Sequence, residues 1–246
     1  MRELKVISRL LDYPSAEVLR HTEEIKQLLL DCDRLSFRLK AQLVHWLTEY
    51  GMSDLMELQE TYGGLFDRGR ATSLLLFEHV HGESRDRGQA MVDLMDLYRS
   101  NGFEIDAREL PDYIPMYIEY LAQRPQAEAE NGLLDVAHIL ALVGARLEDR
   151  GSSYGLLFRS LLDICQADIT VDEFLKQASR EDRDDSLEAL DKIWEEEAVT
   201  FGQDDGSPGC PSSSPAASPN DNQQTTPVHF VDASAQAAET KLRSRP

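Results

Sequence analysis

Apolar residues in the first 201 positions recur every three or four residues, which is the period of a helix that buries one face in a core. Segments that alternate with a period of two are nearly absent, so strands are not expected. The pattern predicts an all-α fold with a single globular domain of roughly eight to ten helices and no internal repeat. The apolar stripes run over residues 4–11, 39–50, 55–66, 91–98, 113–121, 133–147 and 154–165.

Turn and capping residues predict where these helices begin and end. Ser15 can cap a helix that continues through Ile25 and Leu28, and Gly51 separates the stripes at 39–50 and 55–66. Gly102 lies where a helix C-terminal glycine is expected.

Proline and paired polar residues supply the remaining signals. Pro111 suits a first turn before the 113–121 stripe, and Pro125 ends that helix. The spacings Thr170 to Glu173 and Asp185 to Glu188 are typical of capping boxes and predict two last helices; the final one carries Leu187, Leu190 and Trp194.

The composition changes at Gly202. Six of the ten prolines fall in the last 45 residues, together with many serines, and such a segment has too few apolar residues for a packed core. We therefore predict a helical domain over residues 1–201 and a disordered Pro/Ser-rich tail over residues 202–246, which we expect to be dispensable for binding.

The chain carries a net charge of −20, and only −2 of it lies in the tail. This field repels nucleic acid and anionic lipid and favours basic segments of other proteins, although acidity also serves solubility alone. The longest apolar run, residues 139–145, is far shorter than the ~20 residues that span a bilayer, and no secretory signal begins the chain. We expect a cytoplasmic protein that is not embedded in a membrane.

One segment, residues 67–88, does not follow a simple packing pattern. Charged residues lie on both sides of the apolar run Leu74–Phe77. Two interpretations stay open: a buried apolar turn whose charged flanks satisfy one another, or a binding surface.

The pair His79 and His81, with Glu78 and Glu83, raises the alternative of a metal-dependent enzyme, because imidazole and carboxylate are metal ligands. The spacing argues against it, since residues two apart on a helix face different directions and only His79 and Glu83 are four apart. No phosphate-binding loop, nucleophile elbow or cysteine pattern is present. We therefore expect neither an enzyme nor a bound cofactor.

Tyrosine and methionine gather on two stripes. Met repacks easily and Tyr combines an apolar ring with a polar tip, so both suit an adaptable peptide groove, although at helical spacing they also suit a core. The residues are Met91, Met95, Tyr113, Met116, Tyr117 and Tyr120.

The run Tyr62 to Met91 resembles the central signature of the NarJ-type respiratory nitrate reductase assembly chaperones, also called the delta subunit. Three further pieces are similar to that family: Ser8–Pro14, Glu109–Leu121 and Asp191–Glu197. The resemblance covers residues 1 to about 200 and leaves out the tail.

The resemblance implies a fold related to the chaperones of other molybdenum enzymes. It also implies binding to the N-terminal segment of the apo catalytic (alpha) subunit of nitrate reductase, before membrane docking and while molybdenum cofactor and iron–sulfur cluster are inserted. Proteins that deliver the molybdenum cofactor are further candidate partners, and a helical scaffold remains an alternative function. The candidate client-binding residues are Tyr62, Phe66, Arg70, Leu74, Phe77, Glu78, His79, His81, Glu83, Arg87, Met91, Tyr113, Tyr117 and Tyr120.

Overall fold

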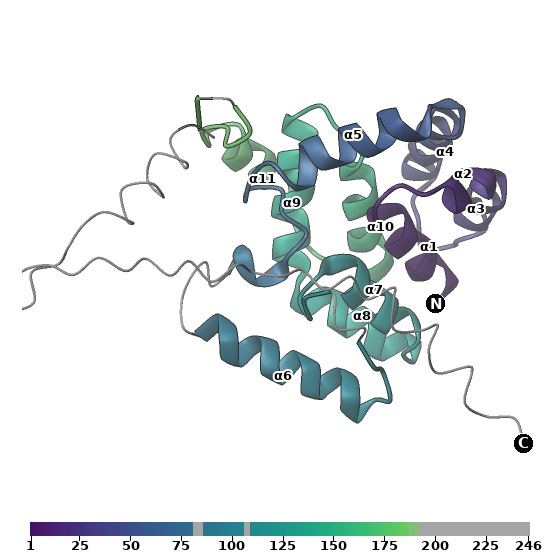
Figure 1. Ribbon diagram of the computed structural model, residues 1–246. Coiled ribbons are helices and arrows are strands. Elements are labelled where there is room, and N and C mark those ends of the chain that lie inside the picture. Colours follow the sequence, from purple (N-terminus) through teal and green to yellow (C-terminus); the bar gives the residue numbers. More distant parts are fainter. Residues whose placement is uncertain (81–85, 106–108, 187, 190, 192–246) are drawn as a thin grey trace, which may run out of the picture. The chain divides into compact units, whose positions relative to one another are not determined.

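The computed structural model describes residues 1–80, 86–105, 109–186, 188, 189 and 191. Within these ranges the chain forms eleven α-helices, a short 3-10 helix at Leu76–Glu78 and no strand, which confirms the predicted all-α class (Figure 1). The helices are α1 (Arg2–Leu11), α2 (Ala16–Arg20), α3 (Thr22–Leu30), α4 (Phe37–Met52), α5 (Leu55–Phe66), α6 (Asp86–Ser100), α7 (Ile114–Ala122), α8 (Gln126–Asp135), α9 (Ala137–Asp149), α10 (Gly155–Cys165) and α11 (Val171–Ala178).

The centre of the helical domain is α10, which packs against α9, α8 and α4. Leu157, Phe158 and Leu161 on its inner face have no solvent exposure. The contact with α9 is close, since a Cβ atom added to Gly144 would lie 2.8 Å from the Phe158 Cβ. Glycine at this position therefore lets the two helices approach.

The N-terminal helix is built into the same core. Leu4, Ile7 and Leu10 of α1 are fully buried, and α1 packs along α7. The Ser8 hydroxyl donates a hydrogen bond to the Pro115 carbonyl over 2.7 Å, so that a buried polar group is satisfied at this contact. The first and middle parts of the sequence are thus joined in one core.

Two predicted helices are each divided in the structure. The segment after Ser15 forms α2 and α3, which meet at His21, and the stripe over residues 133–147 forms α8 and α9, which meet at Val136. Ser15 caps α2 as predicted, since its side chain accepts from the Val18 amide. Neither break carries Gly or Pro, so an apolar period that continues through it gives no sign of the change in direction.

Other predicted boundaries are shifted. Helix α4 does not end at Gly51 but continues to Met52. A Cβ atom at Gly51 would lie 3.2 Å from the Thr22 side chain, so glycine here allows α4 to lie close to α3. The proline in the first turn of α7 is Pro115 rather than Pro111, and Gly102 follows α6 with a φ of +73°, as predicted.

The C-terminal predictions are tested only in part. Thr170 is the N-cap of α11, but its side chain makes no cap hydrogen bond. Asp185 pairs with arginines instead of capping a helix, and the Ser186 hydroxyl accepts from the Ala189 amide. Leu187, Leu190, Trp194 and the tail lie outside the described residues. No helix among the described residues is both long and apolar enough to cross a bilayer.

Candidate functional site

Residues 67–80, here called the signature segment, are joined to the start of α7 by backbone hydrogen bonds. The Leu76 amide donates to the Asp112 carbonyl over 3.0 Å, and the Ile114 amide donates to the Leu74 carbonyl over 2.7 Å. The Asp112 carboxylate accepts from the Phe77 amide at 3.1 Å. Asp112 is fully buried, and this burial raises the pKa of its carboxyl. The signature segment and the chain before α7 therefore form one unit.

Arg146 of α9 and Arg150, the C-cap residue of that helix, join the signature segment to the acidic segment after α11. The Arg146 guanidinium donates to the Glu181 carboxylate over 2.6 and 3.1 Å and to the Ala71 carbonyl over 3.0 Å. Arg150 donates to the Asp184 carboxylate and, over 2.9 Å, to the Thr72 hydroxyl. The hydrogen bond from Arg146 lowers the pKa of Glu181.

His79 lies inside this network. Its Nε2 is 2.9 Å from the Ser73 carbonyl and its Nδ1 is 3.5 Å from Arg146, which fits a neutral imidazole that donates through Nε2 and accepts through Nδ1. Burial, helped by the Arg146 charge, lowers the pKa of His79. Both ring nitrogens are thus engaged, and the described residues contain no cluster of three or more His, Cys, Asp or Glu side chains that could hold a metal ion. His81 and Glu83 lie outside the described residues.

A groove of about 680 Å³ lies between α6 and the chain that follows it, and we call it the α6 groove. Its floor and walls are mostly apolar, with two glutamates and one arginine among them. Pockets of this size and character take apolar side chains of a ligand. The lining residues are Met91, Val92, Met95, Arg99, Glu104, Ile105, Glu109, Leu110 and Pro111.

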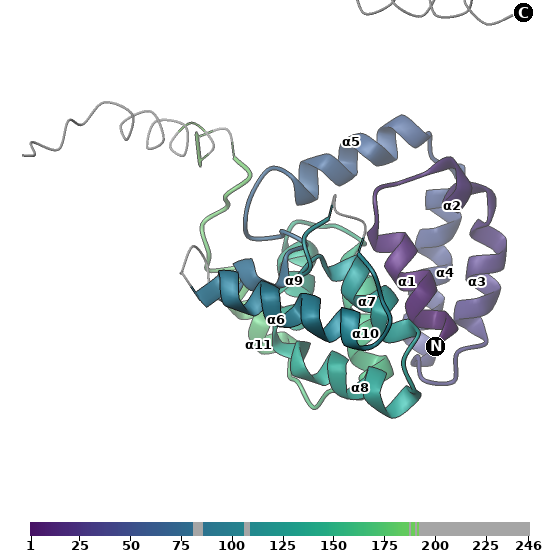
Figure 2. The ribbon, with the colours of Figure 1, turned by 60° about the horizontal axis from the view of Figure 1, so that its bottom comes forward.

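Helix α6 is held to the domain near its two ends. Figures 1 and 2 show it on the outside of α7 and α8. Near its C-terminus the fully buried Tyr98 donates from its hydroxyl to the Pro111 carbonyl over 2.8 Å, and its ring lies 4.9 Å from that of Tyr120. Near its N-terminus Arg87 lies 3.7 Å from Glu78 of the signature segment.

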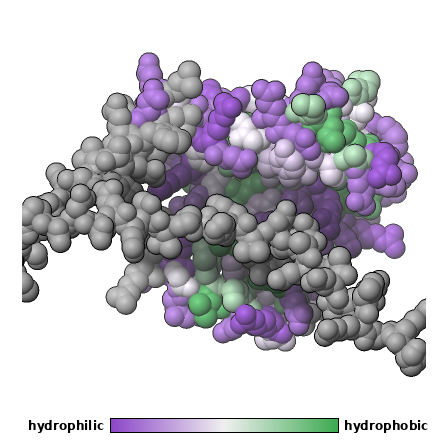
Figure 3. All heavy atoms as spheres, viewed as in Figure 1, coloured by the Kyte–Doolittle hydropathy of each residue, from purple (hydrophilic) through white to green (hydrophobic). Residues whose placement is uncertain are grey.

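The exposed side of α6 is partly apolar. Val92 and Leu97 are 49% and 43% exposed. Figure 3 shows apolar side chains among polar ones at the lower edge, where α6 lies in that view, and over the region of α4 and α5. The other coloured side chains visible in that view are mostly polar.

The structure distributes the sequence-predicted residues over three places. Tyr62 and Phe66 are buried with Trp46 and Tyr154 in an aromatic cluster, and Tyr117 and Tyr120 are buried in the core. Leu74 is buried, Phe77, Glu78, His79, Arg87 and Tyr113 are half-buried around the signature segment and Asp112, and Arg70 is exposed. Among the client-binding candidates that the structure describes, only Met91 lines the α6 groove; Met95, from the methionine and tyrosine set, lines it as well.

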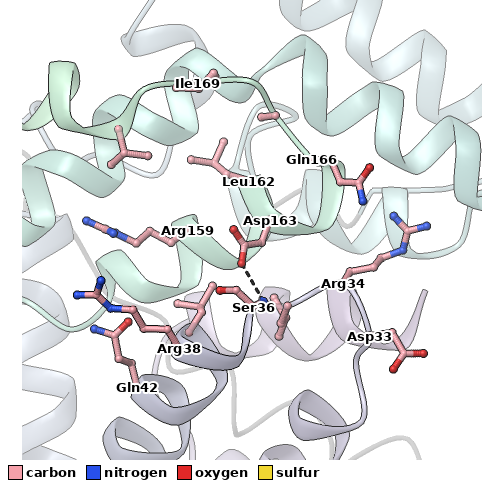
Figure 4. A pocket seen from close by; sticks show the side chains of 14 residues that line it. Asp33, Arg34, Ser36, Arg38, Gln42, Arg159, Leu162, Asp163, Gln166 and Ile169 are labelled. Atoms are coloured by element: carbon pink, nitrogen blue, oxygen red, sulfur yellow. Dashed lines mark hydrogen bonds between the residues drawn. The ribbon is translucent and has the colours of Figure 1, made fainter.

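A second hollow, of about 480 Å³, lies between the start of α4 and the end of α10 (Figure 4). Three of its charged side chains have internal partners: Arg34 pairs with Glu130 at 2.6 Å, the Asp163 carboxylate accepts from the Ser36 amide at 3.1 Å, and Arg159 pairs with Glu148. None of the predicted site residues lines it. We therefore treat the α6 groove as the candidate site.

The sequence reasoning missed Arg146 and Arg150, and also the groove residues Ile105 and Leu110. The signal for the two arginines is a spacing of four at the charged end of a helix whose first part is apolar. Charged residues at that spacing ordinarily face solvent, and only the fold shows that these two face residues 181–185.

Known proteins are similar to this chain over most of its helical domain. The nitrate reductase delta subunit family matches residues 31–159. The nitrate reductase molybdenum cofactor assembly chaperone NarJ of Escherichia coli K12 is 49% identical over 206 residues, which cover 84% of this chain and 87% of the relative. The probable chaperone NarW of the same organism is 42% identical over 239 residues, covering 96% and 98%.

A more distant relative is the probable NarJ of Bacillus subtilis, which is 29% identical over 156 residues, or 63% of this chain and 84% of the relative. All three relatives are named as assembly chaperones rather than as enzymes. The family match spans more than half of this chain, and two of the relatives align with most of it. The chain therefore belongs to the nitrate reductase delta subunit family.

Proposed function

We propose that this chain is a dedicated assembly chaperone of respiratory nitrate reductase; its relatives are named as nitrate reductase molybdenum cofactor assembly chaperones. In this proposal it acts in the cytoplasm, binds the N-terminal segment of the apo catalytic subunit, and delays membrane docking while the molybdenum cofactor and the iron–sulfur cluster are inserted. The observation that carries the proposal is the α6 groove, whose lining is mostly apolar and includes two glutamates and one arginine.

The groove suits a basic amphipathic helix. Met91 and Met95 can repack around different apolar side chains, which is the property that methionine gives to peptide grooves. Glu104 and Glu109 on the opposite wall, in a chain of net charge −20, favour basic residues beside the apolar face of the ligand. The client helix thus places its apolar side chains against α6 and its basic residues near the two glutamates.

The test is a titration of the full chain with the N-terminal peptide of the catalytic subunit at low salt. Met95→Asp places a charge in the groove and is expected to weaken binding at least about tenfold. Met56→Asp is the matched control, because Met56 is 76% exposed on α5 and does not line the groove.

Two results would count against the proposal. If the wild-type chain does not bind the peptide at low salt, peptide capture is wrong. If the peptide binds equally well to both variants, the binding surface lies outside the α6 groove.

A further inference from the structure

The acidic segment of residues 181–185 fits closely against residues 69–72 of the signature segment. The Ala71 amide donates to the Asp184 carboxylate over 2.7 Å. A Cβ atom at Gly69 would lie only 2.5 Å from the same carboxylate, so a larger residue there would push Asp184 away. Residues 69–72 therefore fit closely around the Asp184 carboxylate.

Arg146 of α9 and Arg150 at its C-cap complete the contact. The Arg150 side chain is only 5% exposed, and its forked head reaches the Thr72 hydroxyl with one nitrogen and Asp184 with the other. Arg146 likewise bridges Glu181 and the Ala71 carbonyl. Bidentate arginine contacts of this kind fix geometry as well as adding energy. Three separate parts of the chain therefore meet in one network.

This network lies a few residues from the wall of the α6 groove. Residues 69–72 continue directly into Leu74 and Leu76, which are hydrogen-bonded to the chain at Asp112 and Ile114. Leu110 and Pro111, immediately before Asp112, form part of the groove wall. Residues 69–72 are thus connected to the groove wall through the chain itself and two backbone hydrogen bonds.

We propose that Arg146 and Arg150 are positioning residues for client binding. By clamping residues 181–185 onto residues 69–72, they hold the signature segment, and through it the Leu110–Pro111 wall, in the geometry that accepts the client helix. The inference rests on the proposed function and adds to it a dependence on the acidic segment after α11, which lies outside the groove.

The experiment compares full-length variants in a titration with the client N-terminal peptide. Arg150→Gln is expected to weaken binding about tenfold, and Asp184→Asn to weaken it in the same direction. Both changes weaken the contact between Arg150 and Asp184. The double variant is therefore expected to have about the same affinity for the peptide as the single variant with the lower affinity. The matched control is Arg159→Gln on α10, which breaks an ion pair with Glu148 of α9 but touches neither residues 69–72 nor residues 181–185.

The outcomes separate the two proposals. If the wild-type chain does not bind the peptide, both the proposed function and the positioning role are wrong. Binding by the wild type with equal affinity in folded Arg150→Gln and Arg159→Gln overturns the positioning role alone, and so does an equal loss of affinity in both variants. If Arg150→Gln does not fold, as its melting temperature will show, Asp184→Asn decides, and an unchanged affinity in that variant overturns the inference.

Discussion

At the scale of single residues, His79 links stability to pH. Its imidazole is buried and faces Arg146, so the pKa of His79 in the folded chain is lower than the ordinary value of 6.5. Below about pH 6.5 the unfolded chain therefore binds a proton that the folded chain does not, and stability falls as the pH is lowered. The loss approaches about 1.4 kcal/mol per pH unit between the two pKa values.

Urea unfolding at pH 7.5 and pH 5.5 measures this effect. The wild-type chain is expected to lose more stability between these conditions than His79→Gln, which cannot take up the proton. His138→Gln serves as the control, because His138 is exposed. The same pH dependence in wild type and His79→Gln would show that His79 is not the group responsible.

Gly144 gives a second residue-scale prediction, which concerns packing. A methyl group at this position would lie 2.8 Å from the Phe158 Cβ, closer than side-chain carbons approach in proteins. Gly144→Ala is expected to lower the free energy of unfolding by about 1–3 kcal/mol, measured by chemical denaturation. Gly64→Ala in α5 has open space around it and is expected to be neutral or stabilising. Equal effects of the two changes would contradict the close contact of α9 and α10.

At the scale of elements, the anchoring of α6 decides whether the groove persists. The Tyr98 hydroxyl joins this helix to the Pro111 carbonyl, which belongs to the opposite wall. Tyr98→Phe removes the hydrogen bond and leaves a buried carbonyl unsatisfied, at a cost of about 1–3 kcal/mol. We expect faster amide hydrogen exchange along α6 and weaker peptide binding.

The control for this prediction is Tyr13→Phe. Tyr13 is 52% exposed and lies outside the groove. Unchanged exchange along α6 in Tyr98→Phe would mean that the helix is held by other contacts, such as Arg87 with Glu78.

The helices also show which features of the fold can be predicted from the sequence and which cannot. Long apolar stripes predict α9, α10 and the all-α class, because one face of each helix must be buried. The breaks at His21 and Val136 were not predicted, since neither position carries a glycine or proline and the apolar period continues through both. Arg146 and Arg150 were not predicted either, because their contacts are with residues distant in the sequence.

At the scale of the whole molecule, the charge of −20 acts in two opposite directions. Like charges within the helical domain repel one another and weaken the fold. The same charges, with Glu104 and Glu109 at the groove, attract a basic peptide. Salt screens both effects, because exposed charges interact weakly beyond a Debye length of roughly 8 Å at physiological ionic strength.

Raising the salt concentration is therefore expected to increase the melting temperature of the chain and, over the same range, to weaken its binding to the client peptide. The two trends have opposite signs because one removes repulsion within the protein and the other removes attraction between the protein and its ligand. A peptide whose basic residues are replaced by glutamine is the control, since its affinity is expected to be lower at low salt and nearly independent of salt. If the unmodified peptide also binds independently of salt, apolar contacts alone hold the client, and the acidic surface of this chain serves its solubility.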